Sequence, residues 1–114
     1  MEHEDYMALA LREAQLAARE GEVPVGCVIV KDGEVIAAGH NRRENDHSAL
    51  LHAESIAIHR ACLNLGDWRL ENCRLYVTLE PCLMCAGAIV NSRVPEVFYG
   101  AKDRTFGACG SILN

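Results

Sequence analysis

Residues 73–92, CRLYVTLEPCLMCAGAIVNS, change from one type of secondary structure to another within a few positions. Residues 73–79 are rich in β-branched and other apolar side chains, and they predict a strand. Proline is well tolerated in the first turn of a helix, so Pro81 predicts a helix over residues 81–92 that begins at the cysteines. A strand that leads directly into a helix indicates a layered α/β domain.

The remaining segments of the chain support the same class of fold. Helices are predicted for residues 4–20 and 51–64, where strong helix formers carry apolar side chains at helical spacing. Strands are predicted for residues 23–30, 35–39 and 95–101, and an Asp-Gly turn joins the first two as a hairpin. The order helix, strand, strand, helix, strand, helix, strand predicts a single domain over residues 1–114 with a mixed sheet.

Composition limits the cellular location that we expect. Half of the 114 residues are apolar, which is enough to form a core, but no run approaches the ~18 apolar residues of a membrane span. The first residues, MEHEDYM, are acidic and polar, unlike a secretory signal. We therefore expect a cytoplasmic protein without a membrane partner, whose six cysteines stay reduced.

The net charge of −5 argues against a nucleic-acid partner, but its distribution weakens that argument. Residues 1–34 hold eight acidic and three basic side chains, whereas residues 35–114 hold eight of each. Because the excess of acidic groups is confined to the first third of the chain, a locally basic face elsewhere remains compatible with the composition.

Cys82 and Cys85 form a C-x-x-C pair, which by itself fits a structural zinc site, a redox dithiol, half of a catalytic metal site or two core thiols. Their spacing places both on one face of the predicted helix start. The unpaired N–H groups and the positive dipole end there stabilise thiolates and lower their pKa, which suits metal binding and redox chemistry alike.

A third metal ligand is available in the segment LLHAES, where His52 opens the other central helix. His52, Cys82 and Cys85 would give zinc three protein ligands and leave the fourth position for water, as in catalytic zinc sites. Glu54 lies about 200° around an ideal helix from His52, so the two do not share a helix face. At a helix start, however, Glu54 can lean over the metal and act as a proton shuttle.

The motif HAE at residues 52–54, followed by PCLMC at residues 81–85, matches the H-x-E…P-C-x-x-C signature of the zinc nucleobase deaminases. The blocks EVPVGCVIV, GHNRR, LYVTLEPCLMCAGAIVNSRV and VFYGAKDRTFGACGSILN also resemble stretches of the tRNA-specific adenosine-34 deaminases, and together they cover most of residues 22–114. This resemblance implies a cytidine deaminase-like fold with three α/β/α layers around a mixed central sheet. Family members usually continue past GSILN with a final helix, so we expect this chain to lack the usual C-terminal elements.

The resemblance also implies a chemical mechanism. One Zn²⁺ per chain, held by His52, Cys82 and Cys85, would provide hydroxide that attacks C6 of adenine, with Glu54 as the catalytic proton shuttle. The backbone N–H of Cys82, at the helix start, is a candidate donor to the oxygen bound to zinc.

Substrate contacts and partners follow from the same resemblance. Asn41 is placed against the nucleoside, and the loop that ends at Asp103 is expected to border the sugar. The expected substrate is the anticodon loop of tRNA. A homodimer is implied, and the apolar helix over residues 82–94 could supply its contact.

Three functions remain open at this point. The first is deamination of the wobble adenosine in tRNA. The second is deamination of a free base or nucleoside such as cytosine, cytidine or guanine, which the net negative charge favours. The third is a non-catalytic zinc-binding module, which Glu54 argues against. The loop NDHSALL before His52 departs from the Asp-Pro-Thr-Ala run common in the family, so one wall of the pocket differs. Arg42 and Arg43 could contact phosphate or be a solvated pair, and Phe106 could stack on a base or pack in the core.

Overall fold

The structure is a computed structural model that describes residues 2–103 and 107. Its elements are α1 (His3–Arg19), β1 (Gly26–Lys31), β2 (Glu34–His40), α2 (Ala53–Leu65), β3 (Cys73–Leu79), α3 (Leu83–Asn91) and β4 (Glu96–Ala101). This is the predicted order of helices and strands. The first and last residues of each element differ from the predicted ones by at most three positions, and the largest difference is at the start of β1. Phe106 and most of the segment after β4 lie outside the described residues.

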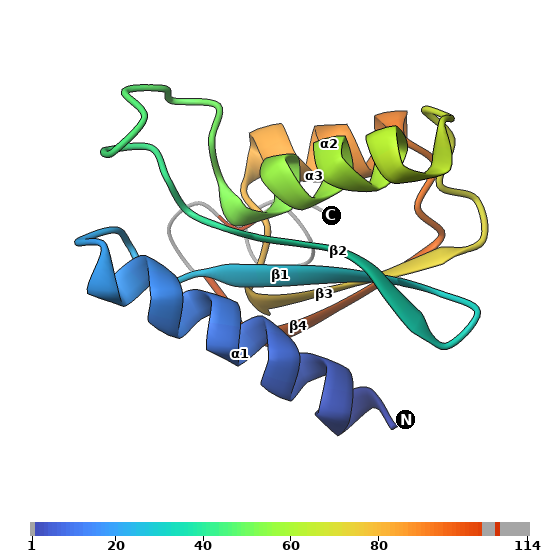
Figure 1. The fold of residues 1–114 in the computed structure, drawn as a ribbon, viewed down its shortest axis with the longest axis horizontal. Coiled ribbons are helices and arrows are strands. Elements are labelled where there is room, and N and C mark those ends of the chain that lie inside the picture. Colours follow the sequence, from blue (N-terminus) through green and yellow to red (C-terminus); the bar gives the residue numbers. More distant parts are fainter. Residues whose placement is uncertain (1, 104–106, 108–114) are drawn as a thin grey trace.

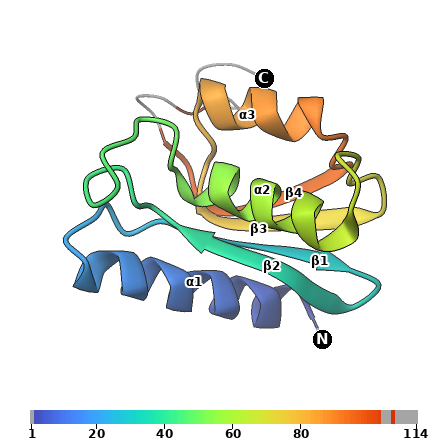
Figure 2. The same cartoon turned by 45° about the horizontal axis from the view of Figure 1, so that its top comes forward.

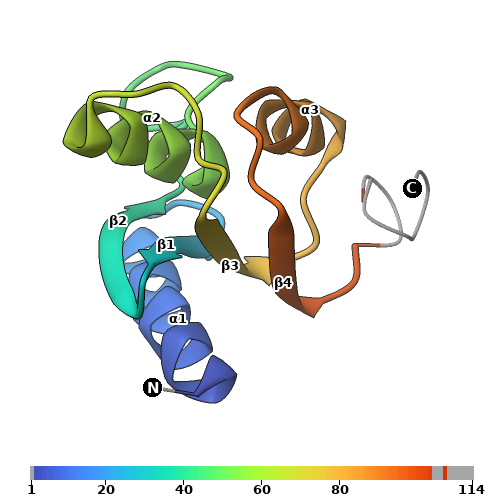
Figure 3. The same cartoon turned by 90° about the vertical axis from the view of Figure 1, so that its right-hand side faces the viewer.

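The four strands form one mixed sheet in the order β2-β1-β3-β4. Strand β1 pairs antiparallel with β2 and β3, whereas β3 pairs parallel with β4. Helix α1 covers one face of the sheet, and α2 and α3 lie side by side over the other (Figure 1 and Figure 3). The predicted three-layer α/β/α architecture is therefore confirmed. Within the part of the chain that the structure describes, no helix is both long and apolar enough to cross a membrane.

The sheet separates two apolar clusters. Cys27 and Ile29 of β1 belong to the larger cluster, beneath α2 and α3. Val28 and Val30 alternate with them and pack against α1, where Tyr6 and Tyr76 are buried. Strand β1 is therefore buried on both faces, which explains its continuous run of apolar residues in the sequence.

Gly39 determines how closely α2 approaches the sheet. A Cβ atom at Gly39 would lie 2.7 Å from the carbonyl oxygen of Ala53 and 2.9 Å from the amide nitrogen of Ala57. The first turn of α2 therefore rests directly on the backbone of β2. Helices α2 and α3 run in the same direction, so their N-terminal ends lie at the same end of the molecule (Figure 2).

The start of α3 differs from the prediction. Its first helical residue is Leu83, and Cys82 is the N-cap with extended backbone angles, φ −74° and ψ 176°. Pro81 therefore precedes the helix and is not part of its first turn. The physical reason is an isolated antiparallel bridge between Cys82 and Gly107, which requires extended backbone at Cys82.

Candidate active site

The three predicted metal ligands lie together between the starts of α2 and α3. His52 is the N-cap of α2, and its Nδ1 atom lies 3.7 Å from Sγ of Cys82 and 3.6 Å from Sγ of Cys85. In tetrahedral zinc sites, Zn–S bonds of about 2.3 Å and Zn–N bonds of about 2.0 Å place nitrogen and sulfur roughly 3.6 Å apart. The donor set and its spacing therefore fit a zinc ion.

The surroundings of these ligands affect their protonation. Burial and the nearby charge of Arg43 lower the pKa of His52, which favours the neutral imidazole that binds metals. Burial raises the pKa of Cys85, and the carboxylate of Glu54 raises it further. Without a metal, the pKa of Cys85 is therefore shifted in the direction opposite to the one expected from the helix start, because the thiol is buried beside Glu54. A bound divalent cation would reverse this shift and stabilise the thiolate.

Glu54 is the second residue of α2 and is only 4% exposed. Burial raises its pKa to about 7, although hydrogen bonds from its own backbone and from Cys85 oppose that shift. A carboxyl group with a pKa near neutrality can accept and donate protons at the pH of the cell. The cation of a filled metal site would lower this pKa.

A cavity of about 430 Å³ opens beside these groups. The structure brings five of the six predicted site residues to its wall, and Cys85 is buried next to it. The five are Asn41, His52, Glu54, Cys82 and Asp103. The volume lies within the usual range for small-molecule sites, so a nucleobase with its sugar can enter.

Asn41 connects the cavity wall to the start of α2. Its Oδ1 atom accepts a hydrogen bond of 2.8 Å from the backbone N–H of Ala53, one of the groups that a helix start leaves without an intrahelical partner. The side chain is thereby fixed next to His52. Elsewhere on the cavity wall, the backbone N–H of Asp103 donates to Oε1 of Glu80 at 3.3 Å.

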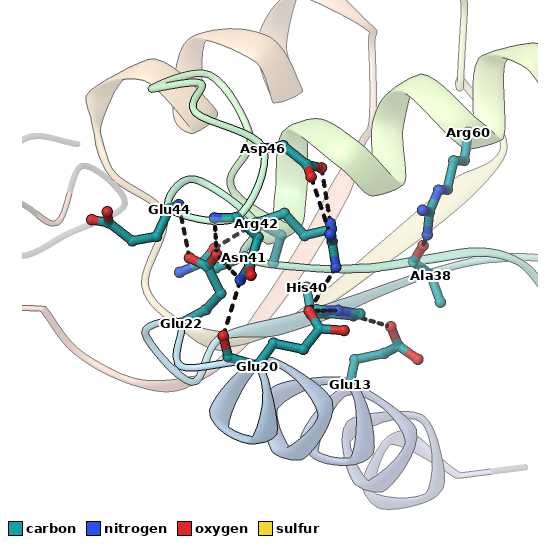
Figure 4. Close-up of polar contacts among 12 residues, drawn as sticks. Glu13, Glu20, Glu22, Ala38, His40, Asn41, Arg42, Glu44, Asp46 and Arg60 are labelled. Carbon is teal, nitrogen blue, oxygen red and sulfur yellow. Dashed lines mark hydrogen bonds and ion pairs between the residues drawn. The ribbon is translucent and has the colours of Figure 1, made fainter.

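Two buried carboxylates at the cavity were not predicted as site residues. The first, Glu22, accepts hydrogen bonds from the backbone N–H groups of Glu44 at 3.1 Å and Asn45 at 2.7 Å, and from Nδ2 of Asn45 at 2.5 Å (Figure 4). Burial alone would raise the pKa of Glu22, but these hydrogen bonds outweigh it and hold the pKa below its usual value. Glu22 therefore fixes the loop that follows Asn41. A glutamate next to the apolar run VPVGCVIV is the one signal in the sequence that could have suggested this role.

The second carboxylate belongs to Glu80, which is only 2% exposed and accepts the hydrogen bond from the backbone N–H of Asp103. A Cβ atom at Gly107 would lie 2.5 Å from the Cδ atom of Glu80, so only glycine allows this approach. The backbone N–H of Gly107 donates to the carbonyl of Asp103 at 2.9 Å. Glu80 therefore fixes the part of the cavity wall that contains Asp103, and Glu22 fixes the loop that follows Asn41.

A network of charged groups ties the loop after β2 to the end of α1 (Figure 4). His40 lies between Oε1 of Glu13 and Oε1 of Glu20, at 3.0 Å from each. Arg42 donates a hydrogen bond of 2.7 Å to Glu20 and two hydrogen bonds, of 2.8 and 3.0 Å, to the carboxylate of Asp46. The guanidinium of Arg42 is thus held within the protein.

Fold and donor set together define the class of zinc-dependent nucleobase deaminases. The family described as the cytidine and deoxycytidylate deaminase zinc-binding region matches residues 1–101. The tRNA-specific adenosine deaminase of Bacillus subtilis (strain 168) is 52% identical over 109 residues, which are 96% of this chain and 68% of that protein. The protein of the same name from Streptococcus pyogenes serotype M18 is 50% identical over 94% of this chain and 67% of its own length. The chain therefore belongs to the family of the tRNA-specific adenosine deaminases.

Two solved structures extend the comparison. One, from a study of A-to-I editing by tRNA deaminases at the wobble position, superposes with a TM-score of 0.93 at 47% identity, covering 96% of this chain and 79% of that one. The other is the guanine deaminase of Bacillus subtilis, with a TM-score of 0.87 at 43% identity, covering 90% and 66%. The chain spans between 63% and 76% of the length of its curated relatives from Streptococcus pyogenes, Bacillus subtilis and Aquifex aeolicus.

Proposed function

We propose that the protein is a zinc-dependent hydrolase that converts adenosine to inosine at the wobble position of tRNA. The observation that carries this proposal is the identity of about half of the residues with tRNA-specific adenosine deaminases, along a chain whose cavity contains His52, Glu54 and Cys82. A tRNA substrate would place the protein in the cytoplasm.

His52, Cys82 and Cys85 would hold one zinc ion per chain, because their donor atoms have the spacing that tetrahedral zinc requires. The ion would supply Lewis acidity and lower the pKa of a water molecule. The buried position of Cys85 keeps bulk water away from the sulfur, and the two helix starts fix the angle between the ligands.

Glu54 would move the protons of the reaction. Its carboxylate would take one proton from the attacking water and deliver it to a ring nitrogen of adenine, and would then take the second proton from the new hydroxyl at C6 and deliver it to the leaving amine. One water is consumed, the C6–N bond breaks, and ammonia and inosine are released.

Three further groups would orient the nucleoside. Asn41, fixed against the start of α2, would contact the nucleoside, and Asp103 would border the sugar elsewhere on the cavity wall. The backbone N–H of Cys82 would hydrogen-bond to the oxygen that adds to the ring. These roles are consistent with the positions of the three residues around one cavity.

The partner that we propose for α3 is a second copy of the chain. Leu83 and Val90 are 65% and 70% exposed, and a Cβ atom at Gly87 between them would meet nothing within 4 Å. An apolar helix face with a glycine at its centre permits close approach of another helix. Analytical ultracentrifugation of the wild type and of Leu83→Glu tests the homodimer, and a monomeric wild type would overturn it.

A second candidate function is deamination of free guanine. It is favoured by the similarity to the guanine deaminase of Bacillus subtilis, at 43% identity and a TM-score of 0.87. The identity and coverage are both higher for the tRNA-specific relatives, which is why the tRNA substrate is preferred here.

One assay separates the two candidates. Zinc-loaded protein is incubated with an anticodon stem-loop bearing adenosine at the wobble position and, in parallel, with free guanine, adenosine, cytidine and cytosine. A stem-loop with guanosine at that position serves as the matched control. Inosine formed only in the adenosine stem-loop supports the proposal, whereas turnover of a free base or nucleoside alone overturns it.

A further inference from the structure

We infer that Arg43 binds a phosphate of the nucleic-acid substrate at the cavity mouth, and that this contact distinguishes a polynucleotide from a free base or nucleoside. The inference rests on the proposed function, for which it names a contact to the substrate backbone. Four features of the structure carry it: the place of Arg43, the charges around it, the fixed backbone beneath it and the different surroundings of Arg42.

Arg43 lies at the cavity that contains the candidate metal ligands His52 and Cys82. It lines the wall together with Asn41 and His52. A group bound by Arg43 would therefore lie beside a base held in the cavity.

The charges of the cavity wall are otherwise negative. Among the described residues that line it, Arg43 is the one basic side chain apart from His52, whereas four carboxylates belong to Glu22, Glu54, Glu80 and Asp103. Carboxylates repel the phosphates of an approaching nucleic acid, and a guanidinium at the mouth offsets that repulsion. A free base or nucleoside carries no phosphate, so its binding does not require this cation.

The backbone around Arg43 is held on both sides. Its carbonyl accepts a hydrogen bond of 3.1 Å from the N–H of Ser48, and the next residue, Glu44, donates its N–H to Glu22 at 3.1 Å. On the other side, the N–H of Arg42 donates to the carbonyl of Leu51 at 3.0 Å. The guanidinium is thus presented from a fixed position, which reduces the entropy lost when a phosphate binds.

The two adjacent arginines differ in what surrounds them. Arg42 grips Asp46 and contacts Glu20 at distances of 2.7 to 3.0 Å, so its donors are used within the protein (Figure 4). The side chain of Arg43 is 52% exposed, and its closest ion pair is a 3.8 Å contact to Glu44. Exposed ion pairs of that length contribute little to stability, so the guanidinium of Arg43 is available for a bidentate contact with a phosphate.

The test is the salt dependence of stem-loop binding. A fluorescent anticodon stem-loop with adenosine at the wobble position is titrated with zinc-loaded protein in a Glu54→Gln background, which leaves the ligand unconverted. Arg43→Gln is compared with Arg12→Gln, which removes the same charge from an exposed position of α1. We expect Arg43→Gln to weaken binding about tenfold at low salt and to reduce the slope of log K against log [salt] by roughly 0.7 to 0.9, the value for one phosphate contact. Arg12→Gln should leave both unchanged.

A second ligand locates the contact. A stem-loop with uncharged methylphosphonate linkages on both sides of the wobble nucleotide lacks the phosphates nearest the cavity. Arg43→Gln should weaken the binding of this ligand by less than twofold, because the partner of the guanidinium is already gone. Arg43→Lys keeps the charge and should retain the salt slope of the native residue.

The outcomes separate this inference from the proposed function. Equal slopes for Arg43→Gln and Arg12→Gln overturn the phosphate contact, even if the wild type converts the stem-loop. A slope that depends on Arg43, together with a wild type that forms no inosine, supports the contact and overturns the function. Loss of zinc or a lower unfolding midpoint in both Arg43 variants would assign the residue a structural role and overturn the inference.

Discussion

The metal-binding region and the rim of the cavity are built in different ways. The three candidate ligands come from two helix starts, and these helices lie on the larger apolar cluster. The rim comprises the loop of residues 41–51 and, among the described residues after β4, Asp103 and Gly107; each of these parts is held by one buried carboxylate. Packing and helix capping therefore position the metal ligands, whereas long-range polar contacts position the groups that face the substrate.

This difference separates the reaction type from the choice of substrate. The guanine deaminase of Bacillus subtilis superposes on this chain with a TM-score of 0.87, so the fold is shared with a protein named for a different base. What the fold supports in common is the chemistry at the helix starts. The rim is the region in which the substrate must be selected, and variants of the two regions should accordingly fail in different ways.

The largest effect is expected for Glu54→Gln, within the metal-binding region. The amide cannot carry the proton, so kcat for the stem-loop should fall by about a thousandfold, within the range of general acid–base catalysis. Zinc content should stay at the level of the wild type, since Glu54 is not among the clustered ligands. Single-turnover inosine formation and metal analysis of the same preparation measure both. Loss of the zinc would contradict the assignment of Glu54 as a proton shuttle.

Gly39→Ala should disrupt the metal-binding region through packing alone. The new Cβ atom would lie 2.7 Å from the carbonyl oxygen of Ala53 and 2.9 Å from the backbone nitrogen of Ala57, and the backbone of α2 cannot yield as a flexible side chain does. We expect a loss of about 3 kcal/mol in the free energy of unfolding, at the upper end for overpacking. Because His52 begins α2, zinc affinity should also fall by roughly tenfold or more. Urea unfolding and chelator competition test the two effects, and an unchanged zinc affinity would mean that α2 does not position its ligand through Gly39.

The sequence predicted the metal-binding region better than the rim, because its signals are local. Strand β3 was predicted at residues 73–79, as the structure has it, since this mostly apolar segment ends close to a proline. His52, Cys82 and Cys85 were selected from their predicted helix starts and from the match to the deaminase signature, and the structure brings them together. The position of Cys85 at a helix start did not indicate that burial raises its pKa in the absence of a metal, because burial depends on how α3 packs.

The rim was less predictable because its contacts join distant parts of the chain. Glu22 holds Glu44 and Asn45, which lie 22 and 23 residues further on, and Glu80 holds Asp103 at a separation of 23. The hydrophobic periodicity of the sequence does not indicate such pairs. Asn41 and Asp103 were expected from the family resemblance, and their roles as substrate contacts remain predictions.

Glu22→Gln should impair the rim while leaving the metal-binding region intact. The amide accepts fewer hydrogen bonds from Glu44 and Asn45, so the loop shifts and KM for the stem-loop should rise about tenfold, with zinc content unchanged. The control is Glu34→Gln, at an exposed position of the hairpin. An equal effect of both variants would show that net charge, and not the loop contact, is responsible.

The same variant should alter how stability depends on pH. The pKa of Glu22 is lower in the folded protein than its ordinary value of 4.5, so the ionised carboxylate stabilises the fold above that value. This contribution is lost as the pH falls through the folded-state pKa. The difference in unfolding free energy between the wild type and Glu22→Gln should therefore be constant above about pH 5.5 and shrink below about pH 4.5. Urea titrations between pH 3.5 and about 7 measure it, and a difference that grows on acidification would contradict the contacts described for Glu22.

Gly66→Ala is expected to have the smallest effect, and it serves as the stability control for Gly39→Ala. Gly66 caps the end of α2 that is farther from His52, in the left-handed region with φ of 66°, which alanine adopts only with strain. The free energy of unfolding should fall by about 1 kcal/mol. Zinc affinity, kcat and KM should stay within twofold of the wild type, because a Cβ at this position meets nothing within 4 Å and the residue does not line the cavity. If Gly66→Ala lowered zinc affinity as Gly39→Ala does, general destabilisation would account for both results, and the metal-binding region would not depend on how α2 packs against β2.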